Sequence, residues 1–185
     1  MTKEYTSSAS WNSAAIAGLI MAAVTIVAEL IGSLCTKLPD FAANLLSFFV
    51  WAGKLVLCAF TFKALLKRFH DSYEGVDYFA LRRYGLKLAL FSSLLVAAYS
   101  LANLLMIHPD SINDTIQTMR ESYSSLLDSN SEAALEKMLP KLPAYIGLVT
   151  VGYCFLWGWI YTGIFSKSIA PYDPFADIQD TPNNQ

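Results

Sequence analysis

Residues 14–34 read AAIAGLIMAAVTIVAELIGSL, an apolar run in which Glu29 is the only charged side chain. A helix needs about 20 mostly apolar residues to cross the hydrocarbon core of a bilayer. The run is longer than the apolar part of a cleaved signal peptide, which has about 7–15 residues. We therefore interpret it as a retained transmembrane helix.

Three further runs have the same character and cover residues 41–62, 85–107 and 143–165. A helix of a soluble protein carries a polar face, whereas these runs carry polar residues only singly. The whole chain is 55% hydrophobic and 15% charged, with a mean hydropathy of +0.40. We therefore predict an all-α membrane protein with four transmembrane helices. The net charge of −2 gives no support for a nucleic-acid-binding protein.

The connection between the second and third runs is the most basic part of the chain. Together with one residue just inside the third run, its basic side chains are Lys63, Lys67, Arg68, Arg82, Arg83 and Lys87. Cytoplasmic loops carry the excess of Lys and Arg. We predict that this hairpin, turning at Gly75, is cytoplasmic, that both termini are cytoplasmic, and that the protein lies in the bacterial inner membrane. The same six side chains either contact anionic lipid headgroups or only fix the topology.

The segment over residues 108–142 is polar overall but amphipathic, because its apolar residues recur every three or four positions between Ile112 and Leu127. We predict an extracytoplasmic helical cap here, which covers the mouth of the bundle or offers a surface to a partner. Residues 166–185 contain three prolines and no helical period, so we predict an extended cytoplasmic tail.

Glu29 and Lys54 are the only charged residues deep within the predicted spans, and an ionisable residue in a membrane is a functional candidate. Small and polar residues share their helix faces, so both should point into the bundle. A hairpin centred near residue 37 or 38 separates the two by about 12 Å along the axis. This spacing disfavours a direct ion pair and favours contacts of Glu29 with Asn44 or Ser47. With Asn103, these residues are the candidate intramembrane polar set.

No catalytic, cofactor or metal site is predicted. The chain has no G-x-S-x-G, P-loop or H-E-x-x-H pattern, and its cysteines and two histidines do not converge along the predicted topology. We interpret the aromatic residues over 153–165 as packing or interface anchors. The expected partners are the lipid bilayer and a membrane protein or a second copy of the chain, without metal or nucleic acid.

The layout resembles a family of small bacterial four-span membrane proteins classed as a domain of unknown function. The resemblance is carried by the charged hairpin, the third span YGLKLALFSSLLVAAYSLANLLM, the acidic segment after it, the proline-led fourth span and the tail PYDPFADI. Family members commonly have a more glycine-rich hairpin than this one, which holds only Gly75. Members often appear beside enzymes that act on lipid-linked sugars.

Two functions are compatible with this sequence. The favoured one is a non-catalytic accessory or scaffolding subunit, in the setting of lipid-linked sugar metabolism that the resemblance implies. The alternative is a small transporter or channel that uses Glu29 and Lys54. An enzyme is not expected.

Overall fold

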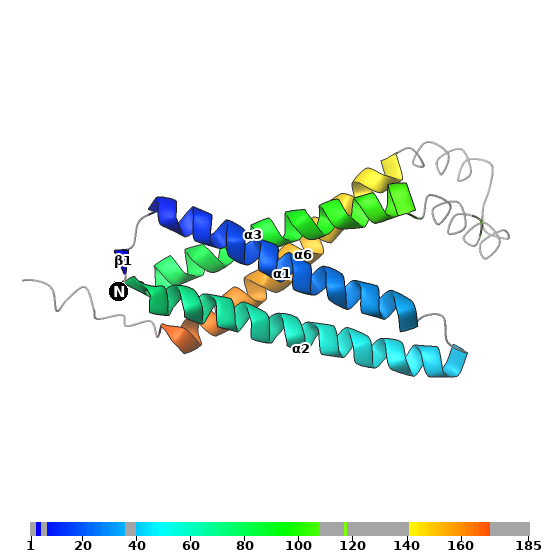
Figure 1. The fold of residues 1–185 in the computed structure, drawn as a ribbon, viewed down its shortest axis with the longest axis horizontal. Coiled ribbons are helices and arrows are strands. Elements are labelled where there is room, and N and C mark those ends of the chain that lie inside the picture. Colours follow the sequence, from blue (N-terminus) through cyan, green and yellow to red (C-terminus); the bar gives the residue numbers. More distant parts are fainter. Residues whose placement is uncertain (1–2, 5–6, 36–39, 108–116, 118–140, 171–185) are drawn as a thin grey trace, which may run out of the picture.

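The computed structural model describes residues 3–4, 7–35, 40–107, 117 and 141–170. Side chains are described over 10–32, 48–106, 117 and 141–170. Within these residues the chain is almost entirely helical, and long helices run along the length of an elongated bundle (Figure 1).

The long helices are α1 (Ser7–Cys35), α2 (Asp40–Ser72), α3 (Tyr78–Ala102) and α6 (Leu142–Ile169). A short π-helical segment, η1 (Asn103–Ile107), continues α3. In the described part of the chain, four helical stretches are long and apolar enough to cross a membrane, as predicted. These stretches are Ser10–Gly32, Phe48–Ser72, Tyr78–Met106 and Leu142–Ile169.

The turn between α2 and α3 is much shorter than the charged segment over 63–83 that was predicted to form the hairpin. Helix α2 continues to Ser72 and α3 begins at Tyr78, so the predicted hairpin is helical except at 73–77. The predicted turn at Gly75 is confirmed, because the φ of Gly75 is +72°, a left-handed conformation that favours glycine. The side chain of Asp77 caps α3 by accepting a hydrogen bond from the Ala80 amide at 2.8 Å.

The first and last described elements of the chain approach this turn. The two-residue strand β1 (Lys3–Glu4) pairs in parallel with β2 (Tyr73–Glu74). The last residues of α6 lie at the same end of the bundle (Figure 1). We call this end, which holds β1, β2 and the end of α6, the turn end.

The predicted tail and cap fall largely on residues that the structure does not describe. Helix α6 continues to Ile169, so the prediction of an extended tail from residue 166 is wrong at its start. The helix ends there because Pro171 disfavours helical backbone in the residue before it. Residues 171–185 lie outside the described residues, as does the cap over 108–142 apart from Gln117 and 141–142.

Three of the helices pack closely through small residues, which let helix backbones approach each other. A Cβ atom built on Gly18 of α1 would lie 2.6 Å from a Cβ atom of α3, and one built on Gly85 of α3 would lie 2.7 Å from Thr162 of α6. A Cβ atom on Gly158 of α6 would collide with Ala89 of α3. Helix α3 is therefore central and packs along both α1 and α6.

Helix α2 joins this core only along its second half. Its buried side chains begin at Cys58 and include Phe62, Leu66 and Phe69. Phe69 stacks on Tyr84 of α3, with ring centroids 3.7 Å apart. Of the α2 side chains described before Cys58, none is buried. The described side chains of α2 before Cys58 thus lie outside the core, and α2 extends past the end of α1 (Figure 1).

The substitution Gly158→Leu is expected to destabilise the bundle, because the added side chain has no room against Ala89. Overpacking costs about 1–3 kcal/mol, which should lower the midpoint of thermal unfolding in maltoside micelles. Gly152→Leu on the same helix is the control, since a Cβ atom there meets nothing within 4 Å. Equal midpoints for the two variants would contradict the close packing of α3 and α6.

Candidate functional site

Glu29 and Lys54 form a direct ion pair between α1 and α2. The Lys54 Nζ donates a hydrogen bond to the Glu29 Oε1 at 2.7 Å. Lys54 is 25% exposed and Glu29 is 35% exposed, so the pair is accessible from one side. The sequence disfavoured a direct ion pair between these two residues without excluding it, and the structure contains one.

The error came from the register assumed for the hairpin of α1 and α2. The hydroxyl of Thr25 lies 3.7 Å from the Cys58 sulfur, and a Cβ atom on Gly32 would lie 3.5 Å from Val50. These contacts shift α2 by about two helical turns relative to a hairpin centred near residue 37 or 38. The shift arises because α2 begins beyond the end of α1 (Figure 1), and it brings Glu29 level with Lys54.

Of the other members of the predicted polar set, only Asn103 has a described side chain. The side chains of Asn44 and Ser47 lie outside the described residues. Asn103 is the first residue of η1, and its backbone N–H donates to the carbonyls of Tyr99 and Ser100. Ser100 borders the cavity described next, whereas Asn103 does not.

The ion pair lines a cavity of about 380 Å³. All four helices contribute to its wall. The lining residues are Met21, Thr25 and Glu29 of α1, Trp51, Lys54, Leu55, Cys58 and Phe62 of α2, Ala89, Ser92, Val96 and Ser100 of α3, and Val149, Thr150, Tyr153, Cys154, Trp157, Gly158 and Tyr161 of α6. Glu29 and Lys54 are the only charged residues in this set.

Several polar groups of the wall donate hydrogen bonds to backbone carbonyls. Thr25 donates to the Met21 carbonyl at 2.9 Å, and Thr150 donates to the Ile146 carbonyl at 2.8 Å. The Tyr161 hydroxyl donates to a carbonyl of α2 at 3.2 Å. Because these donors are already satisfied, the ion pair is the strongest polar feature that a guest in the cavity would meet.

Aromatic side chains of α6 form one wall of the cavity. Tyr153, Trp157 and Tyr161 follow one another at successive turns, with ring centroids 6.4 and 5.8 Å apart. Trp51 of α2 borders the cavity as well. The aromatic residues of α6 were predicted from the sequence to serve in packing or as interface anchors. Their spacing of four residues was the available signal that three of them share a face.

Two free thiols, Cys58 and Cys154, border the same cavity. Across the described ranges, no group of three or more His, Cys, Asp or Glu side chains lies close enough together to hold a metal ion. The cavity thus offers a guest one ion pair, two thiols and a largely apolar wall.

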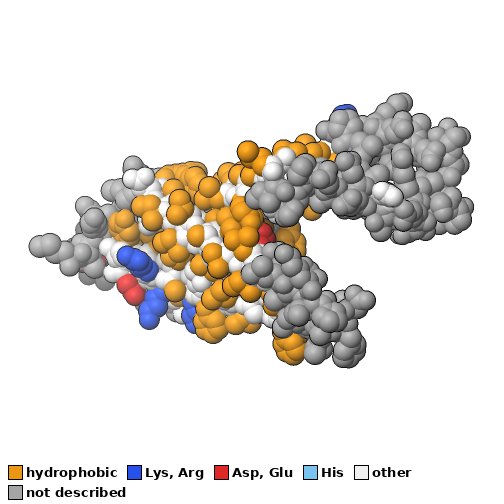
Figure 2. Space-filling view, turned by 45° about the vertical axis from the view of Figure 1, so that its right-hand side comes forward, with side chains coloured by type: hydrophobic (Ala, Val, Ile, Leu, Met, Phe, Trp, Pro, Cys, Tyr) orange, Lys and Arg blue, Asp and Glu red, His pale blue; other side chains and the backbone are white. Residues whose placement is uncertain are grey.

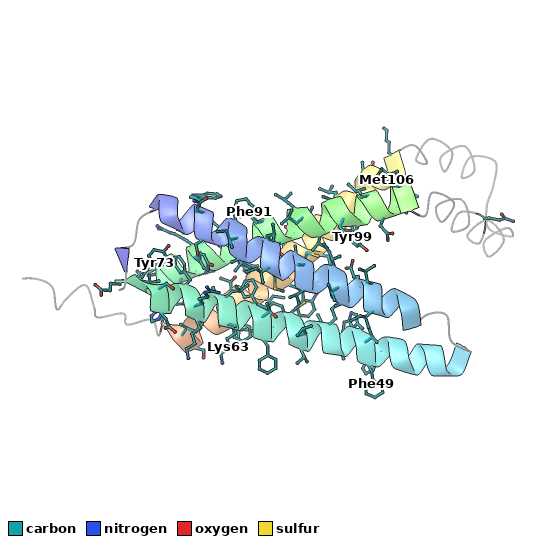
Figure 3. The ribbon with its side chains drawn as sticks, in the orientation of Figure 1. Phe49, Lys63, Tyr73, Phe91, Tyr99 and Met106 are labelled. Carbon is teal, nitrogen blue, oxygen red and sulfur yellow. The ribbon has the colours of Figure 1, made fainter. Side chains whose placement is uncertain are left out.

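The six basic residues lie on the parts of α2 and α3 that flank the turn at Gly75 but do not converge on one site. Lys and Arg side chains are visible near the turn end in Figure 2. Lys63 lies over the Phe165 ring of α6 at 5.9 Å (Figure 3), whereas Lys87 lies over the Trp11 ring of α1 at 4.6 Å and donates to Ser10. The other four are half-buried or exposed: Lys67, Arg68, Arg82 and Arg83. The set therefore spreads around the end of the bundle, and its contact with anionic lipid stays a prediction.

Comparisons with protein-family models, curated proteins and solved structures find no match to this chain. No relative therefore supplies a role for a residue, and the functional argument depends on the cavity and its ion pair.

Replacing one partner of the ion pair is expected to destabilise the protein, because the other charge loses its partner. Glu29→Gln or Lys54→Met should each lose about 1–3 kcal/mol, the range for hydrogen bonds to charged groups, measured by thermal unfolding in maltoside micelles. The exchanged pair Glu29→Lys with Lys54→Glu should recover most of the loss. An exchanged variant no more stable than either single variant would contradict a stabilising ion pair.

Proposed function

We propose that this chain is a multi-pass protein of the bacterial cytoplasmic membrane. Apolar side chains cover most of the visible surface between the ends of the bundle (Figure 2). Large ones are widely exposed, such as Phe49 at 62% and Phe60 at 70%, and Phe49 points away from the bundle (Figure 3). Such a surface is unfavourable in water but matches hydrocarbon.

We further propose that the turn end faces the cytoplasm. The six basic residues from Lys63 to Lys87 flank the turn, in accordance with the excess of Lys and Arg on cytoplasmic connections. The strand β1 and the end of α6 lie at the same end, as an even number of spans requires.

Cysteine labelling in intact spheroplasts tests this orientation. In a chain whose native cysteines are replaced, Glu74→Cys in β2 should react with a membrane-impermeant maleimide only after lysis. Ser124→Cys, between α3 and α6, should react before lysis, because the proposed topology places it outside. The opposite pattern would reverse the orientation, and reaction of both before lysis would reject the four-span topology.

Within the membrane, we propose that the protein binds a ligand in its helix bundle and acts as a small transporter. The observation that supports this role most directly is the Glu29–Lys54 pair in the wall of a 380 Å³ cavity. Ligand sites typically combine a concave, mostly apolar wall with a few polar groups, in a volume of about 300–1,000 Å³. Ionisable residues inside membrane proteins commonly mark a substrate or ion pathway.

A second proposal is a non-catalytic accessory or scaffolding subunit. It is supported by the broad exposed faces of α2 and α6, since only 17% of the most apolar stretch of each helix is buried inside the chain, against 39% for α1. Lipid-linked sugar metabolism is the setting that the family resemblance suggests. A pull-down in mild detergent that recovers one enzyme in stoichiometric amount would favour this role over the transporter.

Thiol accessibility tests whether the cavity admits a ligand. With Cys35 and Cys58 replaced by alanine, Cys154 in the cavity wall should react from outside with a small charged methanethiosulfonate reagent. Gly152→Cys, in a chain that also carries Cys154→Ala, is the matched control. Residue 152 is exposed on the outer side of α6 and should face lipid, where a charged reagent does not reach it. If Cys154 reacts no faster than Cys at 152, the transporter proposal fails.

A further inference from the structure

The cavity has a charged region and an apolar region along the bundle axis. Glu29 lies near the end of the apolar stretch Ser10–Gly32, and Lys54 lies near the start of the stretch Phe48–Ser72, both away from the turn end. Met21 also lines the cavity, two turns from Glu29 along α1, or about 12 Å at 1.5 Å per residue. The cavity therefore suits an elongated molecule with polar and apolar parts.

The charges of the pair restrict which polar part can be accommodated. A guest with only a positive charge would compete with Lys54 for Glu29 and leave an ammonium without its partner. A guest with only a negative charge would leave Glu29 without its partner. An unpaired charge in a low-dielectric site is strongly unfavourable. A guest that carries both charges separates the pair yet gives each side chain a new partner.

The apolar part of such a guest has a matching wall. Trp157 and Tyr161 of α6 and Phe62 of α2 border the cavity on the side of Met21. Phe62 and Tyr161 have ring centroids 5.9 Å apart and are almost fully buried. Packed aromatic rings therefore form the end of the cavity that lies nearer Met21. Aromatic and aliphatic surfaces of this kind favour an apolar chain or ring over water.

We propose that the cavity binds a zwitterion with an apolar body, whose ammonium group pairs with Glu29 and whose anionic group pairs with Lys54. The apolar body extends along α6 toward Met21. This inference rests on the proposed ligand-binding function and names its ligand class. Two sources carry the shared chemistry: an amino acid with an apolar side chain, and a single-chain phospholipid with an ethanolamine headgroup.

Binding to the full chain in maltoside micelles tests the proposal, because this detergent brings no zwitterion of its own. L-Phenylalanine is compared with phenethylamine, which lacks the carboxylate, and with 3-phenylpropionate, which lacks the ammonium. Lysophosphatidylethanolamine is compared with lysophosphatidylglycerol, which has no ammonium. Each probe is titrated while the thermal midpoint is recorded, since a ligand of the folded state raises it. At least one zwitterion should bind about tenfold or more tightly than its singly charged analogues.

Variants assign the binding to the ion pair. Glu29→Gln and Lys54→Met should each weaken binding of the zwitterion by about tenfold or more. The exchanged pair Glu29→Lys with Lys54→Glu should retain it, because both charges are still present. Lys63→Met is the matched control, since Lys63 is a cation of α2 that lies over Phe165, outside the cavity wall. If the single variants do not fold, binding of the zwitterion in the cavity is measured instead by its protection of Cys154 from the thiol reagent. This measurement changes neither charge.

Each outcome has one meaning. Binding of L-phenylalanine alone or of the lysolipid alone supports the proposal and identifies the source. Equal binding of a singly charged analogue overturns the zwitterion while the ligand-binding function stands. If Cys154 reacts with the thiol reagent but no zwitterion binds or protects it, the inference is wrong. If Cys154 does not react at all, the ligand-binding function fails first.

Discussion

Close contact of α3 with both α1 and α6 is the constraint on which the rest of the structure depends. Gly18, Gly85 and Gly158 lie where no larger side chain fits, so α1 and α6 each approach α3 closely. Among the described side chains of α2, those buried in the core begin at Cys58. The four helices gather toward the turn end, whereas α1 with α2 and α3 with α6 diverge toward the other end (Figure 1). The cavity is lined from all four helices.

The Glu29–Lys54 pair acts where this apolar packing is missing. It connects α1 to α2 at a distance of 2.7 Å, ahead of Cys58, in a stretch of α2 whose described side chains are not buried. Two opposite charges in contact carry no net charge into a low-dielectric region, whereas either one alone would be strongly unfavourable. The pair is therefore at once a structural bridge and the polar element of the cavity.

The sequence predicted the features that depend on hydrophobicity and on local backbone. Four apolar helices, the turn at Gly75 and the inward direction of Glu29 and Lys54 all follow from run length, glycine chemistry and helix periodicity. The ion pair could not be predicted in this way, because it depends on the register between α1 and α2. A hairpin centred on its connection was assumed, and the observed register differs by about two turns.

The cavity could not be predicted from the sequence for a related reason. Its wall combines residues of four helices, and their relative heights are set by contacts such as Gly85 with Thr162, which no periodicity within one helix reveals. The tyrosines and tryptophan of α6 were visible as a repeat, but a repeat does not distinguish a lipid-facing stripe from the lining of an internal site. The residues that share one helix face were therefore easier to predict than what that face contacts.

The pairing of β1 with β2 also has a consequence for how the chain is made. Lys3 and Glu4 are synthesised before α1 and α2, whereas their partners Tyr73 and Glu74 follow both helices in the chain. The first strand therefore cannot form this pairing until both helices have been made.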